Sequence, residues 1–247
     1  MNATSPYGTY ISARSRARIT KALLIAGAIV GLLSMFATGL ELMFPELSEE
    51  GDLTDNIGGL VAALLLMGLG LLQILILITT IVFFLMWLYR SYENLRAFGN
   101  PPNTIDYSSG WAVGSFFVPF VNLVVPYRAI KELWRKSEPY NLQSFGAVSP
   151  PAWFPLWWAF WLISNIADNA YFRLTWRGNA SRETLGIVGI AADGLGIIAA
   201  ILAVVVIGEI DQRQQAASKS MALGQPSEPP LPPYFDPPLE TAAFNSN

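Results

Sequence analysis

The chain has 247 residues, of which 53% are hydrophobic and only 13% charged, and its net charge is −3. A soluble domain carries about 25% charged residues, and here the deficit comes from long blocks with almost no charge, which is typical of a membrane protein. The small net charge and the lack of a basic face interleaved with aromatic residues exclude nucleic acid as a partner. The sequence contains no cysteine and no histidine, which removes disulfides, thiolate and imidazole metal sites, and Ser-His triads. We therefore expect no metal, no cofactor and no enzymatic activity.

A polar N-terminus, residues 1–18, precedes the first apolar block. Basic residues at 14, 16, 18 and 21 lead into an apolar run that continues to Phe44 and is too long for a signal peptide. We predict a first membrane-spanning helix at about residues 20–44, ended by Pro45. The loop that follows is acidic and holds no basic residue as far as Asn56.

The second apolar block predicts a span at about residues 57–89. It is longer than the roughly 20 residues that cross a bilayer, so the helix must tilt or project beyond it. Its helical pattern continues to Phe98, because Leu88, Tyr92 and Leu95 fall on one face. The sequence GNPP at 99–102 is a strong helix stop.

The third block is short and broken. Pro119 and Pro126 interrupt it, and Asn122 lies between them. Each proline removes a backbone donor, and in lipid the freed carbonyls need partners inside the protein. Asn122 is predicted to satisfy this broken backbone or to contact a ligand. We expect residues 111–138 to form a re-entrant or interfacial segment.

The end of this segment is amphipathic, which suits a helix lying in the membrane interface. Four cations on its polar side are candidate contacts for anionic lipid headgroups: Arg128, Lys131, Arg135 and Lys136. Plain inside-positive anchoring would use the same residues, because both interactions depend on the negative leaflet.

Two further apolar blocks predict spans at about residues 152–172 and 184–208. The first carries a tryptophan stripe at 153, 157, 158 and 161, which we expect to pack against other helices rather than to form a ligand cage. Residues 211–247 are polar and then proline-rich, and we expect a disordered tail. The fold class is therefore all-α: a single helical membrane domain, residues 19–210, with four spanning helices and one proline-broken segment.

The distribution of Lys and Arg favours this topology over five spans. If residues 111–127 enter and return on one side, four basic clusters lie together: 14–21, 90–96, 128–136 and 213–219. The acidic loop then faces the opposite side. Both termini are predicted to be cytoplasmic.

Several motifs resemble one family. They are WLYRSYENLRAFG at 87–99, GWAVGSFFVPFVNLVVPYRAIKELW at 110–134, WWAFW at 157–161 and IDQRQ at 210–214. Together they are similar to the bacterial membrane family catalogued as domain of unknown function 4328, over roughly residues 60–215. The resemblance implies a multi-pass protein of the bacterial cytoplasmic (inner) membrane and supplies no activity, substrate or catalytic residue.

Asp168 and Asp193 form the candidate intramembrane polar site, because an ionisable group within a spanning helix is expensive and suggests a function. At 1.5 Å per residue they lie at similar depth on neighbouring helices. They would share a proton, or bind a cation beside Asn165 and Asn169. Alternatively, each Asp hydrogen-bonds to a neighbouring helix or pairs with Arg173.

Two functions follow from these features. The first is a non-enzymatic interaction or assembly module that contacts membrane lipids and, through its cytoplasmic segments or proline-rich tail, a protein partner. The second is a small transporter or ion pathway that uses the Asp pair. A polar cavity joining residues 111–134 to the Asp pair would favour transport, whereas dry packing would favour a scaffold.

Overall fold

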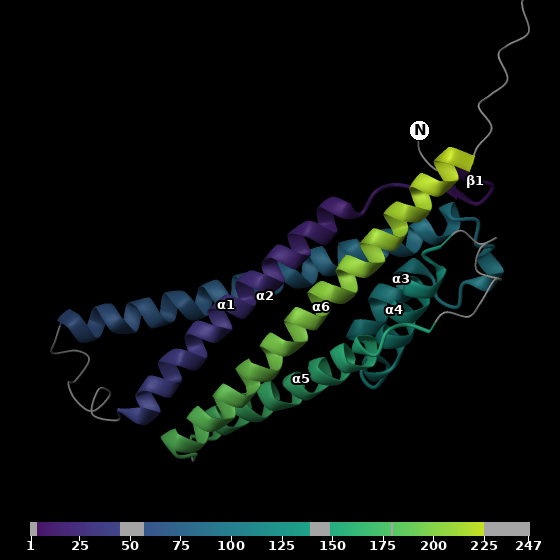
Figure 1. Cartoon of the computed structure of the whole chain (residues 1–247). Coiled ribbons are helices and arrows are strands. Elements are labelled where there is room, and N and C mark those ends of the chain that lie inside the picture. Colours follow the sequence, from purple (N-terminus) through teal and green to yellow (C-terminus); the bar gives the residue numbers. More distant parts are fainter. Residues whose placement is uncertain (1–3, 45–56, 139–148, 179, 225–247) are drawn as a thin grey trace, which may run out of the picture.

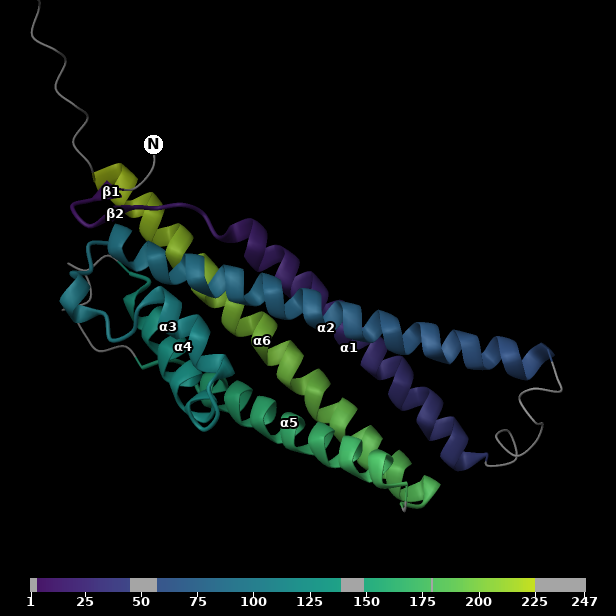
Figure 2. The same ribbon diagram turned by 180° about the vertical axis from the view of Figure 1, so that it is seen from behind.

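The computed structural model describes residues 4–44, 57–138, 149–178 and 180–224. Four long helices lie along one another (Figure 1): α1 (Arg14–Met43), α2 (Ile57–Ala97), α5 (Trp153–Arg177) and α6 (Arg182–Gly224). Helix α6 packs against both α1 and α5, and α2 packs on α1. We call the end where α1 begins and α2 and α6 finish the base, and the opposite end the distal end. Helices α1 and α5 run from the base to the distal end, and α2 and α6 run in the opposite direction, as the view from behind also shows (Figure 2).

Three of these helices are long and apolar enough to cross a membrane: Arg14–Met43, Gly70–Ala97 and Arg182–Leu223. Large apolar side chains lie on their outer faces, such as Phe36, which is 66% exposed, and Leu75, which is 62% exposed. Lipid tails can cover such apolar faces, and a helix hydrogen-bonds its own backbone N–H and C=O groups in this environment. Helix α5, predicted as a fourth span, forms as a helix of 25 residues but is not among these three candidates.

The proline-broken segment is a hairpin of short helices: α3 (Ser109–Gly114), the 3₁₀ turns η3 (Ser115–Phe117) and η4 (Val121–Leu123), and α4 (Val125–Lys136). Its turn forms where Pro119 prevents a continuous helix. There the Val121 N–H donates to the Pro119 carbonyl at 2.8 Å, and Phe120 takes a positive φ of 62°.

The two ends of this hairpin return to the same place. Before it begins, a 3₁₀ turn, η2 (Pro102–Thr104), brings the Thr104 carbonyl to the ammonium of Lys136 at the end of α4. The Asn100 side chain also donates to the Lys136 carbonyl at 3.2 Å. Residues 109–136 therefore start and finish at the base and do not run the length of the bundle.

From Thr4, the described part of the polar N-terminus forms two short strands, which no pattern in residues 1–18 predicts. Strands β1 (Thr4–Ser5) and β2 (Gly8–Thr9) pair antiparallel. Helix α1 then begins at Arg14. The two strands pack on the end of α2, a contact that local sequence patterns do not reveal.

The expected disorder from residue 211 is wrong for residues 211–224, because α6 continues to Gly224. Asp211, Gln214 and Ala217 are buried in this extension. Tertiary packing against the base stabilises these polar turns. The proline-rich stretch at 226–238 lies outside the described residues.

The hydrophobic core lies mainly at the base. Its largest fully buried apolar side chains are Trp87, Phe98, Phe154, Leu88, Leu95, Ile130, Leu133, Ile207, Ile210 and Val206. Phe98 follows the end of α2, and the others come from α2, α4, α5 and α6, so the base packs like a soluble domain. The molecule thus joins a densely packed base to long helices with apolar exteriors.

Candidate functional site

A polar hollow of about 490 Å³ lies among the long helices toward the distal end. Its lining includes residues of α1, α2, α5 and α6: Ser34, Thr38, Glu41, Leu42, Gln73, Asp168, Tyr171, Arg182, Leu185, Gly186, Gly189, Ala192 and Asp193. We call it the distal hollow. The structure thus brings Asp168 and Asp193 together, as their spacing on neighbouring helices predicts.

The two carboxylates differ in their surroundings. Asp193 is half-buried and is hydrogen-bonded by the side chain of Ser34 on α1. Asp168 is exposed, and it interacts electrostatically with Asp193. At the rim, Arg182 and Glu41 approach to 3.9 Å with exposed side chains, which makes a weak ion pair. Three carboxylates, those of Glu41, Asp168 and Asp193, therefore share one polar space with an amide, hydroxyls and the Arg182 guanidinium. Such a set of groups is suited to a proton or a cation.

Asn165 and Asn169 do not join the Asp pair. They line a separate hollow of about 300 Å³, which also includes Asn122 and Leu123. Asn165 donates to the Trp161 carbonyl at 2.6 Å, and Asn169 accepts from the Arg173 guanidinium at 2.7 Å. Positions 165 and 169 share one helix face and 168 lies to its side, so α5 separates the two hollows. Among the described residues, no group of three or more acidic side chains is placed to hold a metal ion.

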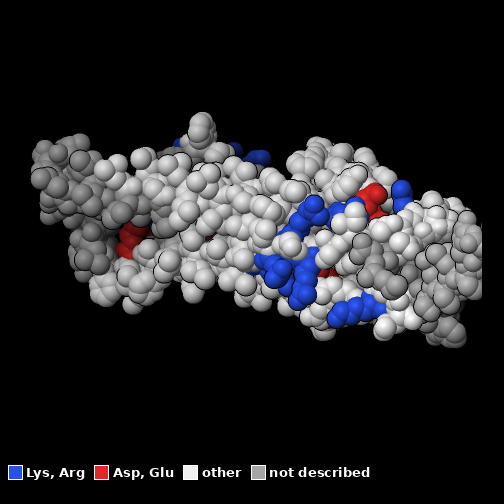
Figure 3. Space-filling view, turned by 90° about the horizontal axis from the view of Figure 1, so that it is seen from above, with Lys and Arg blue, Asp and Glu red and all other residues white. Residues whose placement is uncertain are grey.

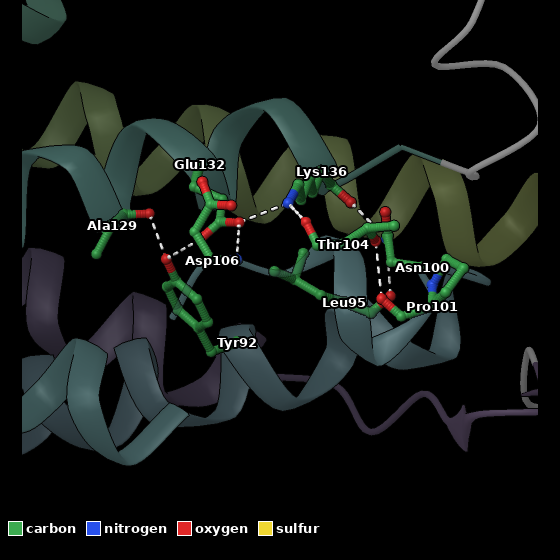
Figure 4. Close-up of polar contacts among 9 residues, drawn as sticks. All are labelled: Tyr92, Leu95, Asn100, Pro101, Thr104, Asp106, Ala129, Glu132 and Lys136. Atoms are coloured by element: carbon green, nitrogen blue, oxygen red, sulfur yellow. Dashed lines mark hydrogen bonds and ion pairs between the residues drawn. The ribbon is translucent and has the colours of Figure 1, made fainter. Parts of the chain in front are cut away.

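A buried carboxylate organises the base (Figure 4). Glu132 on α4 is only 6% exposed. It accepts from the Tyr92 hydroxyl at 3.1 Å and from the Asp106 backbone N–H at 2.7 Å, and it pairs with Lys136 at 2.5 Å. Tyr92 also donates to the Ala129 carbonyl at 2.7 Å. Glu132 thereby ties α2, α4 and the loop before α3 into one unit.

A second buried cluster ties the N-terminus and α6 to the same base. The Asn94 side chain donates to the Ile11 carbonyl at 3.0 Å and accepts from the Ile11 N–H at 3.1 Å. It also donates to Gln214 at 3.2 Å, and Gln214 donates to the Ser91 carbonyl at 2.9 Å and to Ser137 at 3.2 Å. We call the Glu132 and Asn94 clusters together the base network.

A family model described as a domain of unknown function (DUF4328) matches residues 60–212, more than half of the chain. The chain belongs to the DUF4328 family. No curated protein and no solved structure matches it. The DUF4328 region runs from α2 to α6, so α1 and the strands before it lie outside the match.

The motifs that resemble DUF4328 supply much of the base network. Tyr92 and Asn94 lie in the first motif, Glu132 in the second, and Gln214 closes the last. The sequence feature that points to this network is a charged or amide residue among the apolar residues of these motifs. This feature does not reveal the burial of Glu132, because this residue lies among the cations of the amphipathic stretch.

In this DUF4328 protein, the broken hairpin packs against the tryptophans of α5. Pro126 is buried near the start of α4, whereas Pro119 is exposed at the turn. The neighbouring Leu123 carbonyl accepts from the Trp158 indole at 3.0 Å, which satisfies one carbonyl of the broken backbone. The tryptophan stripe of α5 therefore packs against the hairpin: Trp158 also stacks with Tyr127.

The four cations of α4 separate into two groups. Arg128 and Arg135 are exposed and Lys131 is half-exposed, so all three remain candidates for lipid headgroups. Lys136 is different, because its ammonium is held by Glu132 and the Thr104 carbonyl. Its side chain is 19% exposed and is part of the base network.

Proposed function

We propose that this DUF4328 protein is a four-span protein of the bacterial inner membrane whose cytoplasmic base is a non-enzymatic interaction or assembly module. The base network carries the proposal. Its polar groups are engaged by one another, as the bonds of Glu132, Asn94 and Gln214 illustrate. The Trp87 indole N–H and the Ser91 hydroxyl beside the network are buried without a partner among the described residues, but the Glu132, Asn94 and Gln214 side chains are all hydrogen-bonded. Hydrogen-bonded buried networks rigidify a structure and specify one arrangement. This favours a scaffold that presents a surface over a site that transforms a substrate.

The surface offered by such a base is basic. Arg128 and Arg135 project from α4. Behind them, the Trp134 indole donates to Glu209 at 3.1 Å, and the Arg213 guanidinium lies 3.8 Å from the Trp134 ring centroid. These contacts fix α4 on α6, so that its cations keep their position for a partner.

Partner capture tests this function. Chemical cross-linking in native membranes, followed by purification and mass spectrometry, identifies neighbours of the wild-type protein. We expect the double variant Arg128→Glu/Arg135→Glu to lose its partner, because it reverses the exposed charge. The matched control, Asp168→Leu/Asn122→Leu, should keep it. The opposite pattern, with loss in the control and retention in the charge variant, would refute an interaction role for the base.

Cysteine labelling tests the four-span topology, and the natural chain has no cysteine to interfere. Helix α5 has 25 residues, about 37 Å at 1.5 Å per residue, which exceeds the hydrocarbon thickness of about 30 Å. An impermeant maleimide on intact cells should label Glu183→Cys at the distal end. It should label Asn103→Cys and Ser149→Cys only after lysis. Labelling of Asn103→Cys and Ser149→Cys from opposite sides would mean that the hairpin crosses the membrane.

A second function is favoured by one observation, the distal hollow that contains the Asp168 and Asp193 carboxylates. Under this proposal the protein is a small transporter or ion pathway, and Asp168 and Asp193 carry the proton or cation. The hollow does not include the hairpin residue Asn122, which lines the other one. This separation is the reason that we place transport second.

Flux in proteoliposomes tests the transport proposal. We expect pH-dependent flux that Asp168→Asn or Asp193→Asn abolishes, because an amide does not exchange a proton. Glu183→Gln is the matched control, an exposed acid at the start of α6 that does not line the hollow. Wild-type flux in both Asp variants would exclude this mechanism.

A further inference from the structure

An apolar groove runs between α1 and α6 on the outside of the bundle. It has a volume of about 190 Å³. All nine residues that line it are apolar: Leu24, Ile25, Ala28, Ile29 and Leu32 of α1, with Ile197, Ala200, Ile201 and Val204 of α6. Small Ala28 and Ala200 side chains leave the space between the two rows of larger ones. A groove of this kind accepts a hydrocarbon chain.

Cations continue the same face of α1 toward the base. Steps of four and three residues link Arg14, Arg18 and Lys21 to Ile25, Ala28 and Leu32. These steps keep side chains on one face of a helix. The groove is therefore headed by three positive charges, and Figure 3 shows Lys and Arg gathered over this part of the molecule.

Helix α6 continues opposite these cations. The Lys21 ammonium lies 3.9 Å from the position that a Cβ on Gly208 would take, so the absence of a side chain there leaves room for the ammonium. One turn further along, buried Asp211 interacts electrostatically with Lys21, Arg14 and Arg18. Asp211 carries one negative charge against these three positive charges, so this group of four residues is net positive.

The backbone increases this excess. Arg14 and Arg18 belong to the first turns of α1, whose first turn contains no acidic residue and whose N-cap, Ala13, has no side-chain cap. Cations at a helix N-terminus oppose its dipole, which favours an anion there. The Arg14 N–H itself donates to the Ser12 hydroxyl at 3.3 Å. The head of the groove thus combines cations with the positive end of a helix dipole, and both attract a phosphate.

We propose that this groove binds an anionic glycerophospholipid, with its phosphate at Arg14, Arg18 and Lys21 and an acyl chain along Ile25 to Leu32. The dimensions fit. Residues 21 to 32 rise about 16 Å at 1.5 Å per residue, which matches one leaflet, half of a hydrocarbon core of about 30 Å. The cations of α4 also face the leaflet, but no apolar lining residue of this groove comes from α4. The site belongs to α1 and α6 and is independent of the functions proposed above.

Native mass spectrometry of the full chain in neutral detergent tests the proposal. Phosphatidylglycerol and phosphatidylcholine are added separately, and the retained lipid is measured. We expect the wild-type protein to bind phosphatidylglycerol more tightly than phosphatidylcholine. In Arg14→Gln/Arg18→Gln/Lys21→Gln, affinity for phosphatidylglycerol should fall on the order of 100-fold, since each cation near a headgroup contributes about a five-fold factor.

Two further variants locate the site. Arg16→Gln is the matched control, because it removes one charge from the same helix on another face, and it should leave binding unchanged. Ala28→Phe fills the groove without changing any charge and should weaken both lipids. Circular dichroism and size-exclusion chromatography establish that each variant keeps its fold.

Three results would overturn the proposal. The first is equal binding of both lipids that the triple variant does not change. The second is full competition by inorganic phosphate at equal concentration, which would mean that the acyl chain contributes nothing. The third is a dimer that Ala28→Phe dissociates while lipid binding stays intact, which would assign the groove to a second copy of the chain.

Discussion

At the scale of single residues, the fate of a charge depends on what surrounds it. Glu132 and Glu183 are both helical carboxylates, yet Glu132 is 6% exposed and receives three donors whereas Glu183 lies at the surface. A buried carboxylate persists only when it is paired and hydrogen-bonded. Glu132 therefore acts as a structural centre of the base rather than as a solvated side chain.

Removal of Glu132 should destabilise the base strongly. Glu132→Ala leaves the Lys136 ammonium without its carboxylate partner and the Asp106 backbone N–H without its acceptor, and breaking one partner of a buried pair costs about 3–5 kcal/mol. Glu132→Gln keeps an acceptor and should cost less. The free energy of unfolding, measured by SDS titration in mixed micelles, checks this order. The control Glu183→Ala should change it by no more than about 0.5 kcal/mol, and an equal effect of both alanine variants would contradict the role of Glu132.

At the scale of elements, the hairpin is shaped by its turn. Pro119 ends one helical segment, Phe120 takes a φ of 62°, and Val121 closes the turn by its bond to Pro119. A positive φ is unfavourable for a residue with a side chain, and most unfavourable for a β-branched one. The Phe120 side chain is 85% exposed at the tip, and the neighbouring Leu123 contacts Trp158 of α5.

Substitutions at Phe120 should reveal this strain. Phe120→Leu and Phe120→Val both keep an apolar side chain, but we expect the valine variant to be less stable by about 1 kcal/mol. The exposed Phe117 in the 3₁₀ turn η3 is the matched position, and there leucine and valine should differ little. Unfolding free energies of the four variants give the comparison. A similar gap at both positions would mean that backbone strain at Phe120 is not the cause.

At the scale of the whole molecule, α1 lies between α2 and α6. Gly27 and Gly31 lie one turn apart, but they face different neighbours. A Cβ on Gly27 would lie 3.6 Å from Ile76 of α2, and a Cβ on Gly31 would lie 3.6 Å from Ile197 of α6. Small residues let helix backbones approach in a membrane, where apolar burial drives association weakly. Gly27 thus allows α2 to pack closely on α1, and Gly31 allows α6 to do so.

Cross-linking tests this arrangement. The cysteine pairs Gly27→Cys/Ile76→Cys and Gly31→Cys/Ile197→Cys should form disulfides under mild oxidation, because their side chains meet. The exchanged pairs, Gly27→Cys/Ile197→Cys and Gly31→Cys/Ile76→Cys, should not. Mobility on denaturing gels after limited proteolysis gives the result. Efficient cross-linking of the exchanged pairs would mean that α1 is rotated relative to this arrangement.

The sequence predicted the helices well because helix formation depends on local pattern. The end of α2 at Ala97 follows from the stop at Gly99 to Pro102, and the break in the third block follows from Pro119. The face of Leu88, Tyr92 and Leu95 is buried, as its spacing indicates. Three apolar helices could span a membrane, which agrees with the composition.

The candidate site was predicted only in part. Asp168 and Asp193 share a hollow, because equal depth on adjacent helices is a simple consequence of their positions. Asn165 and Asn169 face another hollow, since the rotation of α5 depends on what packs around it. Asn94 binds the backbone of Ile11, 83 residues away in sequence. No local pattern encodes a partner at that distance.

By itself, the sequence determined a chain of long apolar helices and a hairpin broken at its prolines, because hydrophobicity and backbone chemistry act over a few residues. Only the tertiary structure decided which polar groups are buried, where α6 ends, and that Lys136 faces inward while Arg128 faces out. These outcomes depend on groups brought together from distant segments, since a buried charge is tolerated only where such groups satisfy it. The α1–α6 groove and its cations arise in the same way, from two helices at opposite ends of the chain.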